Sequence, residues 1–365
     1  MLYLTIVIPV RNEAEHIAGV LDRLLEQNYD QDKLEIIVVD GMSEDATPHI
    51  VQEYVQKYPN IIRYFTNPKR LASPARNIGV QNARGEAVLI VDGHCIIDNE
   101  EMLRSVSEAF EHTGADCLGR PQPLEMNGCR TPQAEQSGRT PQAERLTWAI
   151  AAARRSPLGH HPDSFIYSGK AQFSPASSVA VAYRKSVFEK IGLFDENFDA
   201  AEDVEFNTRI DAAGLTCYFD PAIAVHYVPR KTLKELKYQM ERYGRGRVRL
   251  WRKHPHTASW KSFAPGLFLF VIIVAVVLFP LSYIGLLKAG LTTGPSLLGM
   301  LWWFALGSFF WCVIVLYIAA VFAESIRLTF KQKRQDIVLF LPVVFFVVHF
   351  GYGWGVLREF FFPRR

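Results

Sequence analysis

Short, nearly continuous apolar runs alternate with amphipathic stretches over the first quarter of the chain. Four of these runs have the composition of strands buried on both faces, at residues 4–9, 34–39, 61–65 and 87–91. Between these runs, apolar side chains recur with helical spacing at residues 17–25, 50–55 and 74–82. The first of these patterns is predicted to begin at Asn12. Strands that alternate with helices predict an α/β fold built on a mostly parallel sheet.

The pattern is less regular beyond residue 119. Residues 119–163 are mostly polar and contain the near-repeat RTPQAEQSG and RTPQAER, which we interpret as an expanded surface loop, with a helical pattern at 147–155. Strand and helix signals then resume, at residues 178–183, 185–191, 202–213, 217–219 and 223–228.

Three long apolar stretches follow. Residues 263–287 and 297–323 contain no charged side chain, and each exceeds the about 20 residues that a helix needs to cross a bilayer. Residues 337–357 contain His349 as their only ionisable side chain, together with one proline and three glycines. The first two stretches are therefore predicted to span a membrane. The third is either a kinked span or a re-entrant hairpin.

Basic residues flanking these stretches predict their orientation. Residues 230–262 are rich in arginine and lysine, the first loop holds only Lys288, and the second loop holds four basic residues. The positive-inside rule then places the N-terminal domain and the second loop in the cytoplasm, on a multi-pass inner-membrane protein. Three full spans would leave Arg358, Arg364 and Arg365 outside, against that rule, whereas a hairpin would return them inside.

Composition excludes several classes of protein. Of the 365 residues, 40 are basic and 37 acidic, but residues 263–365 hold eight basic and three acidic ones, so the remainder is slightly acidic and unsuited to nucleic acid. The five cysteines form no C-x-x-C pair, which disfavours a zinc site or a disulfide scaffold. No glycine-rich phosphate-binding motif occurs, so a nucleotide would be bound by side chains and a cation.

Polar residues follow the predicted strands where ligands bind in parallel sheets. Arg11, Asp40 and Asp92 each come at the carboxyl end of a strand. These positions belong to the first three of four motifs that occur in order, VIPVRNE, DGMSED, VDGHC and AEDVEFNTR, with VHY beyond. In this order and spacing, residues 3–253 resemble glycosyltransferase family 2, with its GT-A nucleotide-sugar fold. The chain is most similar to the membrane-attached branch that includes succinoglycan-type exopolysaccharide glucosyltransferases.

The resemblance implies a divalent cation, Mn²⁺ or Mg²⁺. Asp92-Gly93-His94 occupies the family's D-x-D position, with His94 in place of the second aspartate. Such a cation would neutralise the diphosphate of the departing nucleotide, and an imidazole ligand favours Mn²⁺. The resemblance also suggests His226 as a further ligand; the alternative is a structural histidine at a strand end.

The resemblance further implies a general base near the start of the helix at 202–213. Asp203 would deprotonate the acceptor hydroxyl, and Glu202 would bind the acceptor beside it. The alternative is that both carboxylates only stabilise the helix N-terminus.

Nucleotide contacts are implied for a larger set: Pro9, Arg11, Glu13, Asp40, Arg76, Asn77, Asp92 and Gly93. Arg76 has a surface salt bridge as its alternative role. Ala176 and Ser177 stand where the family commonly has glycine, in the segment that contacts the donor sugar. Arg245 and Arg247 would bind the diphosphate of the donor or of a lipid-linked acceptor; the alternative is contact with lipid headgroups.

We therefore expect three parts: a GT-A domain at 1–229, a basic amphipathic interfacial segment at 230–262, and a membrane domain at 263–365. The expected reaction is inverting transfer of a hexose from a UDP-sugar to a lipid-linked saccharide. Two alternatives stay open. One is a polyprenyl-phosphate glycosyltransferase, and the other is a non-catalytic membrane scaffold that binds nucleotide.

Overall fold

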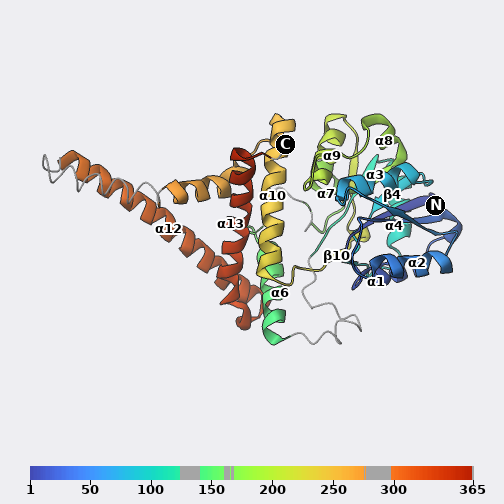
Figure 1. The fold of residues 1–365 in the computed structure, drawn as a ribbon, viewed down its shortest axis with the longest axis horizontal. Helices are drawn as coiled ribbons and strands as arrows, with labels where there is room; N and C mark the ends of the chain where they lie inside the picture. Colours follow the sequence, from blue (N-terminus) through green and yellow to red (C-terminus); the bar gives the residue numbers. More distant parts are fainter. Residues whose placement is uncertain (124–139, 160–164, 166–167, 275, 277–296, 364–365) are drawn as a thin grey trace. The chain divides into compact units, whose positions relative to one another are not determined.

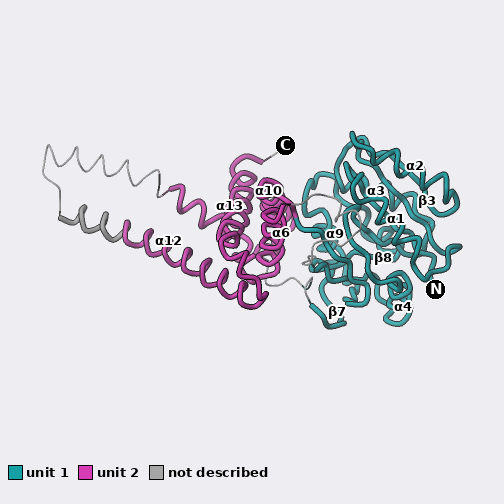
Figure 2. Tube along the Cα trace, turned by 90° about the horizontal axis from the view of Figure 1, so that it is seen from below, with its two compact units in different colours: residues 1–134, 162–229 teal, residues 135–161, 230–365 magenta. Residues whose placement is uncertain are grey.

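The computed structural model describes residues 1–123, 140–159, 165, 168–274, 276 and 297–363, without the side chains of 297–306. Most of the near-repeat, the second half of the first apolar stretch and the last two arginines lie outside the described residues. The chain forms two compact units (Figure 2). Unit 1 comprises Met1–Ala134 and Pro162–Pro229, and unit 2 comprises Glu135–His161 and Arg230–Arg365.

Unit 1 is built on an eight-stranded mixed sheet in the order β3-β2-β1-β4-β8-β6-β9-β7. The strands are β1 (Leu4–Val10), β2 (Leu34–Asp40), β3 (Ile62–Thr66), β4 (Ala87–Ile90), β6 (Cys117–Gly119), β7 (Gln172–Phe173), β8 (Ala180–Arg184) and β9 (Cys217–Phe219). The first four are parallel, as predicted, whereas β8 and β7 run antiparallel to their neighbours. This is the expected Rossmann-like GT-A arrangement.

Helices cover both faces of this sheet (Figure 1). They are α1 (Ile17–Leu25), α2 (Thr47–Lys57), α3 (Ala72–Asn82), α4 (Met102–Thr113), α7 (Ala176–Val179), α8 (Lys185–Ile191) and α9 (Glu202–Ala212), with short 3₁₀ turns η1 (Gln31–Lys33) and η2 (Pro221–Ile223). The first helix begins later than its pattern suggested, because Asn12 adopts φ 56° and belongs to a loop.

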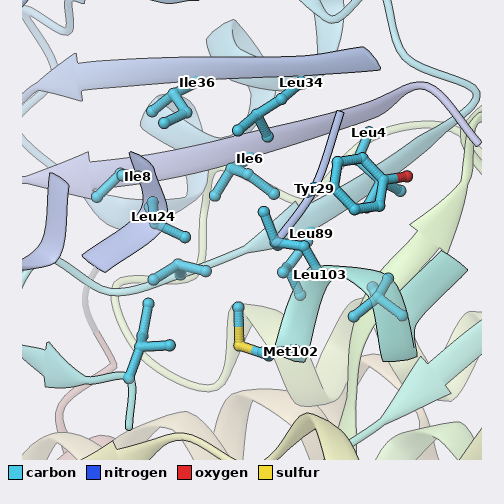
Figure 3. Close-up of a cluster of buried hydrophobic side chains, with 14 of the residues drawn as sticks. Leu4, Ile6, Ile8, Leu24, Tyr29, Leu34, Ile36, Leu89, Met102 and Leu103 are labelled. Carbon is cyan, nitrogen blue, oxygen red and sulfur yellow. The ribbon is translucent and has the colours of Figure 1, made fainter. Parts of the chain in front are cut away.

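The apolar strands pack as their composition predicts. Along β1, Ile6 and Ile8 point to one face and pack with Leu24, Ile36 and Leu103 (Figure 3). Val7 points to the opposite face and joins a second cluster that includes residues of α3, α8 and α9. The central strands are thus buried on both sides, which fixes their ends at one edge of the sheet.

Unit 2 is helical. It contains α6 (Pro141–Arg154), α10 (Leu233–Lys253), a helix at Trp260–Val274, α12 (Leu297–Gln332) and α13 (Phe340–Phe361), with short turns η3 (Pro255–Thr257) and η4 (Gln335–Ile337). Residues 141–154, which we assigned to the first domain, thus belong to unit 2.

Two segments of unit 2 are long and apolar enough to cross a membrane, by length and composition: Gly307–Gln332 and Phe340–Phe361. The hairpin alternative for the third apolar stretch is wrong, because α13 is one continuous helix. Its proline, Pro342, lies in the first helical turn, where a backbone N–H has no partner within the helix, so the helix continues through it.

Candidate active site

The carboxyl ends of four strands meet at one edge of the sheet in unit 1. Strands β1, β2 and β4 are parallel, and β6 shares their direction because both β4 and β6 are antiparallel to β8. The residues that follow these strands, Arg11, Gly41, Asp92 and Arg120, therefore gather at this edge. We call it the carboxyl edge.

Asp40, the last residue of β2, is held in a fixed orientation. It is 2% exposed, and its carboxylate accepts hydrogen bonds from the backbone N–H of Ser43 (3.1 Å) and the hydroxyl of Tyr64 (3.2 Å). Burial and the nearby Asp40 charge raise the pKa of Tyr64 to about 12, so this hydroxyl stays a donor at neutral pH. The predicted nucleotide contact would use the remaining acceptor capacity of Asp40.

The loops after β1 and β2 are tied together beside this residue. The Ser43 hydroxyl accepts from the backbone N–H of Asn12, and the Asn12 side chain accepts from the N–H of Glu44, each at 2.8 Å. A Cβ on Gly41 would lie 3.4 Å from that of Arg11. Arg11 therefore projects, exposed, directly beside the Asp40 loop.

His94 is oriented by Glu13. The His94 Nδ1 lies 3.0 Å from Glu13 Oε1, and the two side chains are only 20% and 19% exposed. With a proton on Nδ1 donated to Glu13, the lone pair of the ring lies on Nε2, the nitrogen through which this histidine would bind a metal. The Tyr227 ring contacts His94 edge-on, at 5.4 Å between centroids.

Gly93 allows this approach. A Cβ at Gly93 would lie 2.8 Å from Val10 Cγ1 and 3.3 Å from Glu13 Cγ, so a larger residue would push the loop after β4 away from β1. The glycine between Asp92 and His94 thus keeps the D-x-H segment against the end of the first strand.

His226 is placed differently from His94. In the antiparallel pair of β5 (Cys95–Ile96) and β10 (His226–Tyr227), His226 is opposite Ile96 and Tyr227 is opposite Cys95. The His226 ring lies 3.9 Å from Asp98. Among the described residues, no group of three or more His, Cys, Asp or Glu side chains forms a metal site. The role of His226 as a ligand stays a prediction.

The chemistry of Asp92 and His94 fits a hard divalent cation such as the Mn²⁺ or Mg²⁺ expected here. Mg²⁺ and Mn²⁺ are commonly bound by one or two protein ligands plus phosphate oxygens of a substrate. Asp92 supplies a carboxylate, and His94 supplies an imidazole nitrogen that Glu13 orients. The phosphates of a nucleotide sugar would complete the coordination.

Arg76 connects the D-x-H segment to the start of α9. Its guanidinium lies 3.0 Å from Glu202, with side chains 11% and 9% exposed, so the surface salt bridge considered above is in fact a buried pair. Burial alone would lower the pKa of Arg76, but the charges of Glu202, Asp203 and Asp92 outweigh it and raise that pKa. Charges from both acidic motifs therefore act on the same buried guanidinium.

At the start of α9, the adjacent residues Glu202 and Asp203 have different environments. Glu202 is buried against Arg76, whereas Asp203 is exposed and accepts a 2.8 Å hydrogen bond from the adjacent Val204 N–H. Ala201, at the N-cap, has φ 60°, a left-handed conformation that is unfavourable for a residue with a Cβ. This turn presents Asp203 to solvent while Glu202 points inward.

Asn77 has a structural role. Its amide donates to the Phe194 carbonyl and accepts from the Phe194 N–H, both at 2.9 Å, and it also donates to Glu196 at 3.0 Å. Asn77 thus anchors the segment before α9 to α3. Its predicted nucleotide contact is untested.

Arg120 was missed by the sequence analysis. It follows β6 at the carboxyl edge, is 2% exposed, and donates from Nη2 to the Ile90 carbonyl at 3.4 Å. Its Nε and Nη1 have no hydrogen-bond partner among the residues that the structure describes. Burial lowers the pKa of Arg120. In the sequence, the only feature that could have indicated a site role for Arg120 is its position directly after a short apolar strand.

The remaining predicted positions belong to two other helices, α7 and α10. The backbone N–H groups of Ala176 and Ser177 donate to the Asp211 carboxylate, at 2.7 and 3.1 Å, and this fixes the short α7. Arg245 and Arg247 lie on α10 in unit 2, where Arg245 is buried.

A GT-A sheet with carboxylates and an oriented histidine at its carboxyl edge is the arrangement that the resemblance to glycosyltransferases predicts. The comparisons agree: the "Glycosyl transferase family 2" model matches residues 5–157, and "Glycosyl transferase family group 2" matches residues 140–356. The chain therefore belongs to the family 2 glycosyltransferases.

Similar proteins include two curated enzymes. One is the Dolichyl N-acetyl-alpha-D-glucosaminyl phosphate 3-beta-D-2,3-diacetamido-2,3-dideoxy-beta-D-glucuronosyltransferase of Methanococcus voltae, 25% identical over 360 residues, which cover 98% of this chain and 97% of that protein. The other is Succinoglycan biosynthesis protein ExoA of Rhizobium meliloti, 27% identical over 262 residues, 71% of this chain and 73% of that protein.

Among solved structures, the mannosyltransferase PcManGT from Pyrobaculum calidifontis, in complex with GDP-Man and Mn²⁺, is similar in fold. The TM-score is 0.55 at 18% identity, and the match covers 97% of this chain and 87% of that one.

Proposed function

We propose that this enzyme transfers a hexose from a UDP-sugar to a lipid-linked saccharide, with inversion at the anomeric carbon. The proposal is supported by the buried Arg76–Glu202 pair at the start of α9, together with the charges of Asp203 and Asp92, which both raise the pKa of the same arginine. The acceptor class is supported by the Methanococcus voltae relative, whose name describes a dolichyl-phosphate-linked sugar as acceptor.

In this mechanism Asp203 is the general base. A sugar hydroxyl has a pKa far above 7, so its attack needs a carboxylate within hydrogen-bond reach. Asp203 is exposed, whereas Glu202 is committed to Arg76, and this difference favours Asp203 as the base. Glu202 and Arg76 then act together to position the start of α9.

The donor would be held at the carboxyl edge, in a site that includes Pro9, Arg11, Asp40 and Gly93. Asp92 and His94 would hold the divalent cation, which neutralises charge on the departing diphosphate. Glu13 keeps His94 oriented toward it. Attack from the face opposite the leaving group inverts the anomeric centre, so an α-linked donor gives a β-linked product.

The long apolar helices support membrane association. We place the catalytic unit on the cytoplasmic side of a multi-pass protein, where cytoplasmic nucleotide sugars are available. This orientation follows from the distribution of basic residues around the apolar stretches.

The test is incubation of membranes containing the full chain with a panel of radiolabelled UDP- and GDP-sugars, followed by organic extraction. We expect label in the lipid-soluble fraction from a UDP-hexose, and loss of that label with Asp203→Asn. A fully active Asp203→Asn variant would favour a polyprenyl-phosphate acceptor, because an ionised phosphate needs no base. Intact UDP binding without turnover of any donor would indicate a nucleotide-binding scaffold.

A further inference from the structure

Helices α10 and α13 of unit 2 lie side by side and run in the same direction (Figures 1 and 2). Residues further along α10 contact residues further along α13. Met240 lies against Gly351, Glu241 pairs with Arg358 at 2.5 Å, and Arg249 pairs with Glu359 at 2.9 Å. The contact therefore covers the whole C-terminal half of α13.

Glycines bring the two backbones into direct contact. A Cβ on Gly244 would lie 2.2 Å from the Tyr352 carbonyl oxygen, and one on Gly355 would lie 2.1 Å from the Glu241 carbonyl oxygen. Neither lipid nor a side chain can separate the helices at these points. Any environment that surrounds this part of α10 must therefore also surround α13.

That environment cannot be hydrocarbon, because α10 is highly charged. Of its 21 residues, these are charged: Lys234, Glu235, Lys237, Glu241, Arg242, Arg245, Arg247, Arg249, Arg252 and Lys253. One arginine or lysine at a bilayer centre costs about 2.5–3.5 kcal/mol even on the most lenient scales. Helix α10 and the part of α13 beside it, from Gly351 to Phe360, therefore lie outside the hydrocarbon core.

A buried ion pair reinforces the contact. The Glu359 carboxylate accepts from Arg249 Nε and Nη2, at 2.9 and 3.2 Å, and Glu359 is 1% exposed. Arg252 donates to the backbone carbonyls of Glu359 and Phe360, both at 3.0 Å.

The rest of α13 is too short to cross a bilayer. Residues 340–350 extend about 16 Å as a helix, against a hydrocarbon core of about 30 Å. This half is also covered by polar structure, because His349 Nε2 lies 2.7 Å from the Leu158 carbonyl oxygen just beyond α6. Although α13 has the composition of a membrane span, its surroundings are those of an interfacial helix.

Among the residues that the structure describes, several large side chains of α13 are exposed. Val343, Phe346 and Trp354 fall on a single stripe opposite the face that packs against α10. Phe361 continues this stripe and stacks on Phe270, and the exposed Phe360 lies to one side of it. An apolar, aromatic stripe backed by a basic helix is the pattern of a helix that lies in a membrane interface. Helix α12 of the same unit, 36 residues long and mostly apolar, is the neighbouring candidate span.

We propose that α13 does not cross the membrane. Its aromatic stripe lies in the headgroup–acyl boundary of an anionic bilayer, and the basic residues of α10 attract that leaflet. The two ends of α13 then face the same side. This topology returns Arg358 and the two terminal arginines to the side of the loop after α12, in agreement with the positive-inside rule.

The test compares the two ends of α13 in the full chain. In a variant whose five native cysteines are replaced by serine, Gln335→Cys marks the start of α13, and a cysteine-containing tag appended after Arg365 marks its end. Sealed vesicles of both orientations are labelled with a membrane-impermeant maleimide, and detergent-solubilised protein defines full labelling. We expect both markers to react in the same vesicle orientation. Reaction in opposite orientations would overturn the proposal.

A depth measurement gives an independent readout. Nitroxide labels replace Leu339, Phe346, Trp354 and Phe361 one at a time in vesicles of phosphatidylethanolamine and phosphatidylglycerol, and oxygen and nickel-chelate accessibilities report depth. An interfacial helix gives a similar shallow depth at all four positions. A spanning helix gives a depth that passes through the bilayer centre between Phe346 and Trp354, and that result would contradict the proposal.

Discussion

Removing the Arg76 side chain tests the charged cluster most sharply. In Arg76→Met, Glu202 would remain nine-tenths buried without its cation, and Asp203 and Asp92 would lose the same positive charge. Breaking a buried ion pair by removing one partner costs about 3–5 kcal/mol, because the remaining charge is uncompensated. Since domains are stable by about 5–15 kcal/mol, this variant should lose a large part of the stability of unit 1.

Hydrogen exchange followed by mass spectrometry is the suitable assay, because the two-unit chain need not unfold in one step. Peptides from α3 and α9 should lose protection equivalent to about 3 kcal/mol or more. The double variant Arg76→Met, Glu202→Gln should recover most of that loss, because no buried charge is left without a partner.

The matched control is Arg63→Met, which removes a 2.8 Å pair to the 2%-exposed Glu35 carboxylate away from the carboxyl edge. It should weaken protection of β2 and β3 and leave UDP binding intact. A loss below about 1 kcal/mol in Arg76→Met, as for an exposed pair, or no recovery in the double variant, would refute the reasoning.

Three further predictions concern the site itself. Asp203→Asn should abolish transfer while UDP binding stays intact by calorimetry, and Glu189→Gln, which neutralises an exposed carboxylate on α8, should change neither. Glu13→Gln should weaken Mn²⁺ binding measured with UDP by about 10–100-fold, because His94 loses its orienting carboxylate; unchanged affinity would argue against His94 as a ligand. Burial raises the pKa of the Cys95 thiol to about 12, so it should resist iodoacetamide at pH 8.5 unless the chain is unfolded. Because that pKa is raised on folding, its stabilising contribution is full below the unfolded value near 9 and is lost as pH rises toward 12.

The pattern of apolar residues was sufficient for the sheet. The first four strands and the helix Lys185–Ile191 form as predicted, because each run is apolar on the faces that become buried. Helix boundaries were less predictable. Asn12 looked like the start of a helical pattern, but its side chain ties two loops together, a contact between residues far apart in sequence.

The candidate site was predictable in its acidic motifs but not in its supporting contacts. The order of motifs placed Asp92 and Asp203 in one family pattern, and the structure adds the Arg76–Glu202 pair that decides which carboxylate is exposed. Sequence could not show that the Tyr227 ring contacts the His94 ring, because the two residues are far apart along the chain. Nor could it show Arg120, since buried arginines are rare.

The third apolar stretch shows why composition alone is insufficient. Residues 340–361 have the length and apolar character of a membrane span. Only the packing of Gly355 against the charged helix α10 shows that its environment is not hydrocarbon.

In the proposed mechanism, a cation-bound UDP and the base Asp203 share one site at the carboxyl edge. The most direct measurement is the distance between Mn²⁺ bound with UDP and a nitroxide attached at Asp203→Cys, obtained from the paramagnetic effect of the metal on the nitroxide spectrum. Because the base, the attacking hydroxyl and the leaving phosphate must be nearly in contact, the account predicts a separation of about 10–15 Å once the label's own length is included. A separation of about 25 Å or more, too long for any shared substrate geometry, would contradict it.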